Sequence, residues 1–373
     1  MLQKFLSIVV ILLAVSYHGF FRNFLFTFLG VGRSLSQIQE FPYACHRLEH
    51  PSLSSCEDLW LDEENRTLAN NFNASGRRKT DHFSVLNIDY PGEDGLYGVH
   101  HLEVTGPYKG INPENENVLD LHGFGARKLS QSRLQFFVVN HRPPTSPEGL
   151  LAENTNVVGD NSTIEVFELE RGSSKLEFVK TIVDDNLISP NDLTRFLQLR
   201  ELQSFYGSGN LIACDLGSGE CHPVIQHGLR YANGVVQGHD GLIYISEFIA
   251  GRISAYKVLS NGAFIRVDTI DLKMPIDNLY IDTDGSLWAP GVPKVQPLLR
   301  TVETGERIDV PSTVYRTRNL GDSKAPRFDV RKVLEDGVGI VLPGSTAVVH
   351  DVQTGKLFMG GVGSPFMAVC APK

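Results

Sequence analysis

Short apolar runs separated by turn-forming residues dominate the chain from residue 40 onward. Few segments show the spacing of apolar positions that is typical of an amphipathic helix. Gly, Asn, Asp and Pro interrupt the runs, as they do between the strands of antiparallel sheets. The pattern predicts an all-β protein with many short strands, for example at residues 136–139, 162–167, 243–245 and 253–256.

One strand–turn–strand pattern occurs twice. The first copy starts at Asn233 and contains Asp240-Gly241; the second starts at Asn278, 45 residues later, and contains Asp284-Gly285. Asp-Gly pairs suit the positive φ angles of a tight hairpin, and the spacing is in the range of β-propeller blades. About 330 residues would supply six or seven such blades. A β-sandwich with two unrelated hairpins is the alternative.

A propeller would give the asparagines of this repeat a shared position. Blades are related by rotation about a central channel, so equivalent residues point toward the same axis. An Asn at the start of each inner strand would therefore place several amide oxygens around one point. Candidates of this kind are Asn191-Asp192, Asn233 and Asp277-Asn278.

The N-terminus resembles a targeting segment. Lys4 precedes an apolar run at residues 5–15, and a second apolar run follows at residues 24–31. This layout predicts a secretory signal or an uncleaved signal anchor over residues 1–39. The folded domain would then occupy residues 40–373. A buried helix is less consistent with the pattern, because the run has no polar face.

Cleavage of this segment is open, although Ala14-Val15-Ser16 is a suitable site. Either outcome places the domain in the secretory pathway, secreted or membrane-anchored on the extracytoplasmic side. Three sequons then become candidate glycosylation sites on surface loops. They begin at Asn65, Asn73 and Asn161.

The five cysteines form no C-x-x-C pair, which argues against zinc ribbons and thioredoxin-like motifs. Disulfides are the default expectation in an oxidising compartment. Cys214 and Cys221 flank a turn-rich stretch and could face each other across a hairpin. Cys45 and Cys370 lie near the ends of the folded region, which leaves Cys56 as a free thiol.

Composition and motifs argue against some classes of partner and enzyme. Hydrophobic residues make up 42% of the chain, as in ordinary folded proteins. The net charge of −9 offers no basic footprint for nucleic acid. The sequence also contains no G-x-S-x-G motif, so a nucleophilic-serine hydrolase is not favoured.

Several short motifs together resemble the serum paraoxonase/arylesterase family over about residues 40–371. They occur in the order and approximate spacing of that family. They are Cys56-Glu57-Asp58-Leu59, Leu121-His122-Gly123-Phe124, Val138-Val139-Asn140-His141, Ser189-Pro190-Asn191-Asp192, Ala232-Asn233-Gly234, Asp277-Asn278 and Gly344-Ser345-Thr346-Ala347. The resemblance implies a six-bladed β-propeller, closed by a disulfide between Cys45 and Cys370.

The resemblance also implies two calcium ions. The positions that match the ligands of the catalytic ion are Glu57, Asn191, Asn233, Asp277 and Asn278. All supply hard oxygen donors, as calcium prefers. The positions that match the structural ion are Asp58, Asp192 and the backbone carbonyl of Phe124.

Hydrolysis of lactones, aryl esters or phosphotriesters is the implied activity. The catalytic calcium would stabilise the developing oxyanion. His122 matches the proposed general base of the family, and His141 matches the histidine that tunes it; imidazole suits this role near neutral pH. Two alternatives share the scaffold: a non-hydrolytic biosynthetic enzyme similar to strictosidine synthase, and a non-catalytic binding propeller.

Two departures limit what can be transferred. The stretch between Asn191 and Asn233 is shorter than in vertebrate members, where it carries an amphipathic helix that helps bind lipid surfaces. Lipoprotein association is therefore not expected, although the N-terminal segment allows membrane attachment. Ala289-Pro290-Gly291 stands where the family often has Cys-His. Substrate preference is thus not carried over.

Overall fold

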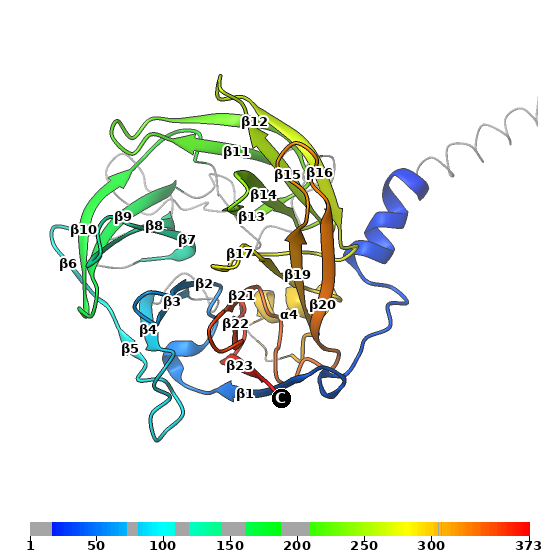
Figure 1. Cartoon of the computed structure of the whole chain (residues 1–373), viewed down its shortest axis with the longest axis horizontal. Coiled ribbons are helices and arrows are strands. Elements are labelled where there is room, and N and C mark those ends of the chain that lie inside the picture. The colour runs from blue at the N-terminus through cyan, green and yellow to red at the C-terminus, as the bar shows by residue number, and fades with distance from the viewer. Residues whose placement is uncertain are drawn as a thin grey trace, which may run out of the picture.

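The computed structural model describes residues 17–72, 81–108, 119–142, 161–187, 207, 209–304, 306 and 308–373. In this part of the chain, sheets surround a central axis as in a β-propeller (Figure 1). The all-β prediction is thus confirmed. The four strands expected from the pattern lie in β8 (Arg133–Arg142), β9 (Asn161–Glu170), β14 (Leu242–Glu247) and β15 (Arg252–Val258).

Five sheets form blades of four or five strands each. From the axis outward, the first blade consists of β2 (Asp58–Asp62), β3 (Thr67–Phe72), β4 (His82–Asn87) and β5 (His100–His101), and the second of β7 (Leu121–Lys128), β8, β9, β10 (Lys175–Ile182) and β6 (Glu103–Thr105). The third blade consists of β13 (Ala232–Gln237), β14, β15 and β16 (Phe264–Asp271), and the fourth of β17 (Tyr280–Ile281), β18 (Leu287–Gly291), β19 (Ser312–Asn319) and β20 (Phe328–Asp336). The fifth blade consists of β21 (Ala347–His350), β22 (Leu357–Gly360), β23 (Met367–Pro372) and β1 (Tyr43–Leu48).

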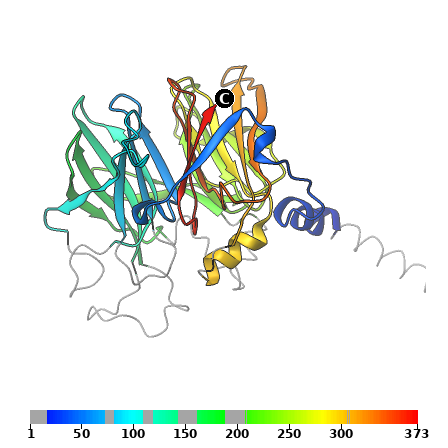
Figure 2. The same cartoon turned by 90° about the horizontal axis from the view of Figure 1, so that it is seen from below.

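The remaining described elements are few. A two-stranded sheet pairs β11 (Gly209–Cys214) with β12 (Cys221–Leu229). Helical segments are η1 (Tyr17–Phe21), η2 (Asn23–Phe28), η3 (Ile38–Glu40), η4 (Pro51–Leu53) and α4 (Val295–Thr304). Seen from the side, α4 projects from one face of the ring (Figure 2).

The predicted Asp-Gly hairpins are confirmed. Asp240-Gly241 joins β13 to β14, and Asp284-Gly285 joins β17 to β18. Gly241 has a φ of 77° and Gly285 a φ of 75°. This left-handed backbone is the conformation for which glycine is favoured.

The first and last strands close the ring. β1 pairs antiparallel with β23, and Cys45 lies opposite Cys370 in the register. A disulfide joins these two residues, and a second joins Cys214 to Cys221 across the β11–β12 hairpin. Cys56 is free and buried, as expected.

An arginine clamp ties the β2–β5 blade to the β21–β22 turn. Arg66 donates from its two terminal nitrogens to the two carboxylate oxygens of Asp351, at 2.6 Å each. It also donates to Asp89 at 2.9 Å. Burial raises the pKa of Asp351. The hydrogen bonds and the charge of Arg66, together with other hydrogen bonds, lower this pKa by more than burial raises it, so that it falls to about 2. This bidentate pair therefore fixes the two neighbouring blades to each other.

Part of the N-terminal region packs on the propeller. Phe28 of η2 is buried in a cluster with Phe248, Ile249 and Val292. Arg33 donates to the backbone carbonyls of Thr27 and Pro293. The second apolar run of the expected leader therefore contributes to the core. The first run lies outside the described residues, and no described helix has the length and hydropathy needed to cross a membrane.

The sequons occupy different settings. Asn65 is exposed in the turn between β2 and β3, and Asn161 is the first residue of β9. Asn73 lies outside the described residues. Glycosylation at all three positions stays a prediction, as does the domain division at residues 39 and 40.

Removing the ring-closing disulfide should cost more stability than removing the hairpin disulfide. The chain-entropy argument gives about 5–6 kcal/mol for the long loop and about 2.5 kcal/mol for the short one, as upper estimates. The sequence separations are 325 and 7 residues. Urea unfolding of a Cys45→Ala/Cys370→Ala variant, compared with Cys214→Ala/Cys221→Ala, measures the difference. Equal losses would contradict closure of the ring as the source of stability.

The Arg66–Asp351 pair should make stability depend on pH in acid. The pKa of Asp351 is about 2 in the folded protein, whereas an Asp in an unfolded chain has a pKa of about 3.9. The pair therefore stabilises the fold above pH 4. This contribution is lost as the pH falls toward 2. Asp351→Asn should flatten the pH dependence of the unfolding free energy between these values. Asp89→Asn, which changes the exposed partner of Arg66, should leave the slope close to that of the unaltered protein.

Candidate metal centre

The starts of the innermost strands bring the candidate ligands together. β2, β7, β13, β17 and β21 are the strands nearest the axis (Figure 1). Glu57 directly precedes β2, Asn233 lies at the start of β13, and Asp277-Asn278 precedes β17. Four of the five residues predicted to hold the catalytic ion therefore occupy equivalent places in three blades. The fifth, Asn191, lies outside the described residues.

A β-bulge recurs at this position. β7 has one extra residue between Leu121 and Phe124, relative to its partner β8. β13 has one extra residue between Ala232 and Val235, relative to β14. Bulges bend a strand and redirect its side chains, and they are frequent beside active sites. His122 and Asn233 both lie in these bulges, which locally free them from the strict alternation of an extended strand.

Hydrogen bonds fix Glu57 and Asn278 to each other. The Asn278 amide donates to Glu57 Oε1 and to the Glu57 backbone carbonyl, at 2.9 Å each. The buried hydroxyl of Thr346, just before β21, donates to the same carbonyl at 3.0 Å. The Asn278 N–H donates to the Thr346 carbonyl at 3.1 Å. Thr346 thus links two ligand positions, a role that its motif alone did not predict.

The blades that carry Asn233 and Asn278 approach closely through a glycine. A Cβ atom at Gly234 would lie 2.7 Å from the Leu279 nitrogen and 2.8 Å from the Asn278 Cα. Any side chain at this position would therefore push the β13 and β17 starts apart. The Gly234 N–H is held by the Ser246 hydroxyl at 2.7 Å. Asn233-Gly234 thus places a candidate ligand beside the glycine that lets the two strands approach.

The site holds buried polar atoms without hydrogen-bond partners, and all but one of them are oxygens. These are both carboxylate oxygens of Asp277, Oε2 of Glu57, and the amide oxygen and nitrogen of Asn233, counted within the described residues. Asp277 and Glu57 are 0% and 1% exposed. An uncompensated buried carboxylate is strongly unfavourable. Such oxygens fit a cation as their missing partner.

Electrostatics support the same conclusion. Burial raises the pKa of Asp277, and the neighbouring charges of Glu57 and Asp58 raise it further. Burial also raises the pKa of Glu57, while its hydrogen bond from Asn278 opposes the change. The Asn233 amide lies close enough to Asp277 to lower its pKa, but outside hydrogen-bonding geometry. The charges of Glu57 and Asp58 therefore both act on the buried carboxylate of Asp277, and a dication would relieve this repulsion.

Carboxylate and amide oxygens are the donors that calcium prefers, so the residues present fit a calcium ion. Within the described ranges, no three His, Cys, Asp or Glu side chains form a metal-binding group by themselves. The candidate site therefore depends on its amides as well as its carboxylates.

The second predicted ion has fewer described ligands. The Phe124 N–H donates to Asp58 Oδ2 at 3.0 Å, so the structure brings these two residues together. The role of the Phe124 carbonyl as a ligand stays a prediction. Asp192 lies outside the described residues.

The two candidate catalytic histidines are neighbours. Their ring centroids are 5.0 Å apart, with the planes inclined by 59°. His141 is buried, and its Nδ1 lies 2.9 Å from the Ser162 hydroxyl. The start of β7 is held by Asp81, whose carboxylate accepts the Leu121 N–H at 2.6 Å. Asp81 is a further positioning residue, and its isolated place in the sequence offered no signal.

A β-propeller with a buried oxygen-rich centre at the starts of its inner strands is the class that this geometry defines. A sequence model described as Arylesterase matches residues 213–366. Among curated proteins, serum paraoxonase/arylesterase 1 of Mus musculus is 27% identical over 271 residues, which are 66% of this chain and 68% of that protein. Serum paraoxonase/arylesterase 2 of Homo sapiens is 25% identical over 266 residues, or 64% and 65%. Over these regions the chain is similar to proteins of the paraoxonase/arylesterase family.

Solved structures show more distant similarity. A luciferin-regenerating enzyme matches with a TM-score of 0.47 and 11% identity, over 88% of this chain and 95% of that one. Regucalcin, a calcium-binding protein from Agrobacterium tumefaciens, matches with a TM-score of 0.42 and 12% identity, over 90% and 95%. Similarity at this level has no bearing on the activity.

Neutralising Asp277 should separate metal binding from folding. With calcium removed by EDTA, Asp277→Asn should unfold at an equal or higher temperature than the unaltered protein, because one buried charge is gone. Added calcium should stabilise the unaltered protein, by about 2.7 kcal/mol at a concentration 100 times the Kd, but should scarcely stabilise the variant. Calorimetry with and without calcium measures both effects.

Glu303→Gln on the exposed face of α4 is the matched control and should respond to calcium normally. A calcium response in Asp277→Asn equal to that of the control would contradict this metal centre.

Proposed function

We propose that this protein is a calcium-dependent hydrolase of lactones, aryl esters or phosphotriesters. The similarity to arylesterases supports a hydrolase. The observation that supports calcium is the set of buried, unpartnered oxygens of Glu57, Asn233 and Asp277. Bound there, calcium would supply Lewis-acid stabilisation of the negative charge that develops on the substrate oxygen.

The residues of the chain would have three roles. Glu57, Asn233, Asp277 and Asn278 would hold the catalytic ion, with Asn191 as the remaining ligand, and Asp58, Asp192 and Phe124 would hold the structural ion. Thr346 would keep Glu57 and Asn278 in position through the hydrogen bonds described above. His122 would accept a proton from the attacking water and return it to the leaving group.

His141 would tune this base rather than contact the substrate. Its position 5.0 Å from the His122 ring supports an influence on that ring. The Ser162 hydroxyl at 2.9 Å from Nδ1 orients the buried imidazole.

The proposal extends to the architecture and location. The β11–β12 sheet lies in the ring between the β6–β10 blade and the β13–β16 blade (Figure 1), which supports a sixth blade at this place. The two disulfides support an oxidising compartment. Together with the expected leader, they support a secreted or membrane-anchored domain. Its partner would be a small ester or lactone.

A substrate panel tests the activity. Phenyl acetate and a δ-lactone should be hydrolysed in calcium and not in EDTA. His122→Gln should lower kcat by about 100-fold or more, while its calcium-induced stabilisation remains. Glu303→Gln should keep the activity of the unaltered protein.

Full activity after complete calcium removal would contradict a role for the metal. If no ester or lactone is turned over while calcium still binds, the non-hydrolytic and binding hypotheses gain instead.

A further inference from the structure

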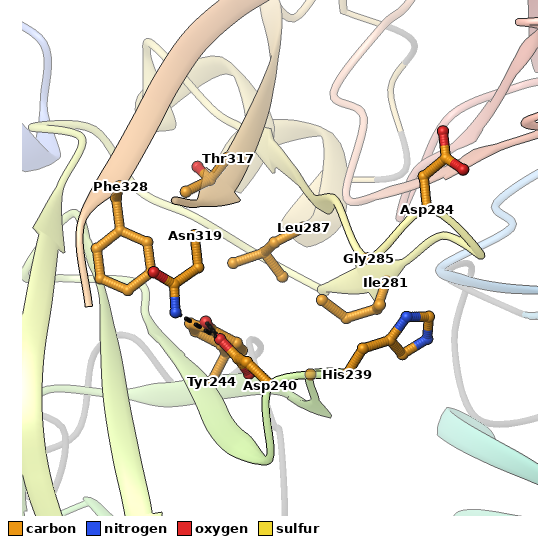
Figure 3. A pocket seen from close by; sticks show the side chains of 11 residues that line it. His239, Asp240, Tyr244, Ile281, Asp284, Gly285, Leu287, Thr317, Asn319 and Phe328 are labelled. Atoms are coloured by element: carbon orange, nitrogen blue, oxygen red, sulfur yellow. Dashed lines mark hydrogen bonds between the residues drawn. The ribbon is translucent and has the colours of Figure 1, made fainter. Parts of the chain in front are cut away.

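Figure 3 shows a cavity of 280 Å³. It lies at the opposite end of the inner strands β13 and β17 from the candidate metal centre. β13 begins with the bulge at Asn233 and leads into the turn at Asp240, which lines the cavity. β17 follows Asn278 and ends at Ile281, which also lines it. The cavity lies between two neighbouring blades and is separate from the centre described above.

Asp240 forms the polar wall of this cavity. Its Oδ2 accepts hydrogen bonds from the Tyr244 hydroxyl and the Asn319 amide, at 2.7 Å each. Its Oδ1 accepts the Leu242 N–H at 3.1 Å. All three donors are neutral, so none of them compensates the charge of the carboxylate. A carboxylate can accept about four hydrogen bonds, which leaves Oδ1 able to accept another.

A second acceptor, Thr317, lies on β19, on the same face as Asn319. Thr317 is 2% exposed and lines the cavity, and its hydroxyl has no hydrogen-bond partner among the described residues. It precedes Asn319 by two positions, which corresponds to about 7 Å along a strand. Leaving a buried hydroxyl unpaired costs about 1–3 kcal/mol. A polar group of a ligand in this cavity would remove that cost.

The charge of the cavity favours a cation. Its described lining residues include no Lys or Arg, and His239 is the one basic side chain among them (Figure 3). Asp284 at the rim is paired with Arg318 at 3.8 Å, and its side chain is 54% exposed. Among the described residues, Asp240 therefore carries the charge of this wall that no Lys or Arg side chain pairs with.

The rest of the cavity is apolar. Leu287 and Ile281 lie in the middle of the lining, and Phe328 lies beside Asn319 (Figure 3). The aromatic rings of Phe328 and Tyr244 add faces that attract cations. We propose that this cavity binds a small primary amine, with its ammonium group between Asp240 and Thr317 and its apolar body against Leu287 and Phe328.

Fluorine NMR titration of the full chain with 4-fluorobenzylamine tests the proposal. The matched probes are 4-fluorobenzyl alcohol, which is neutral, and 4-fluorobenzoate, which is an anion. The amine should bind at least 10-fold more tightly than the alcohol, and the benzoate should not bind. Asp240→Asn should weaken amine binding at least 10-fold, and Thr317→Val about 3-fold or more. Asp284→Asn should change it less than 2-fold.

Two further variants determine where the amine binds. Asp277→Asn should leave amine binding unchanged, and a loss of binding there would overturn the proposal by moving the amine to the metal centre. Ile281→Trp, which fills the cavity, should abolish binding and decides the question if Asp240→Asn does not fold. Equal affinity for the amine and the alcohol, or full binding by both Thr317→Val and Ile281→Trp, would also overturn it.

Discussion

Mutual repulsion among buried carboxylates is the constraint on which this site depends. Glu57, Asp58 and Asp277 come from two blades, and the charges of Glu57 and Asp58 both raise the pKa of Asp277. Such a group is tolerated only when a cation or a proton compensates it. The hydrogen bonds of Asn278 and Thr346 orient Glu57 without neutralising its charge. The grouping of these carboxylates therefore lowers the stability of the ring near its axis and, for the same reason, favours binding of a cation there.

The fold was largely predictable because its signals are local. Alternating apolar positions predicted β8, β9, β14 and β15, and the Asp-Gly pairs predicted two hairpins. Asn233 and Asp277-Asn278 were identified by their repeat, which reflects rotation of equivalent blades about one axis. Glu57 depended on the family resemblance, because nothing in the adjacent sequence distinguishes it from an ordinary surface acid.

Other features could not be predicted because they arise from distant contacts. Thr346 gains its role only when β21 lies beside β2 and β17. Phe28 belongs to an apolar run that is consistent with a leader, yet it is buried against Phe248. The bulges at His122 and Asn233 are differences in register between paired strands, which no single strand reveals. Sequence patterns thus indicated candidate ligands more readily than the residues that position them.

The covalent closure of the ring has a consequence for a cut chain. Cys45 and Cys370 enclose nearly the entire propeller in one covalent loop. A single cleavage by a protease anywhere inside this loop would leave both fragments joined, with β1 still paired to β23. A nicked molecule would keep its mass under non-reducing conditions and would separate only after reduction. The closure therefore keeps the two fragments of a singly cleaved chain in one covalent molecule.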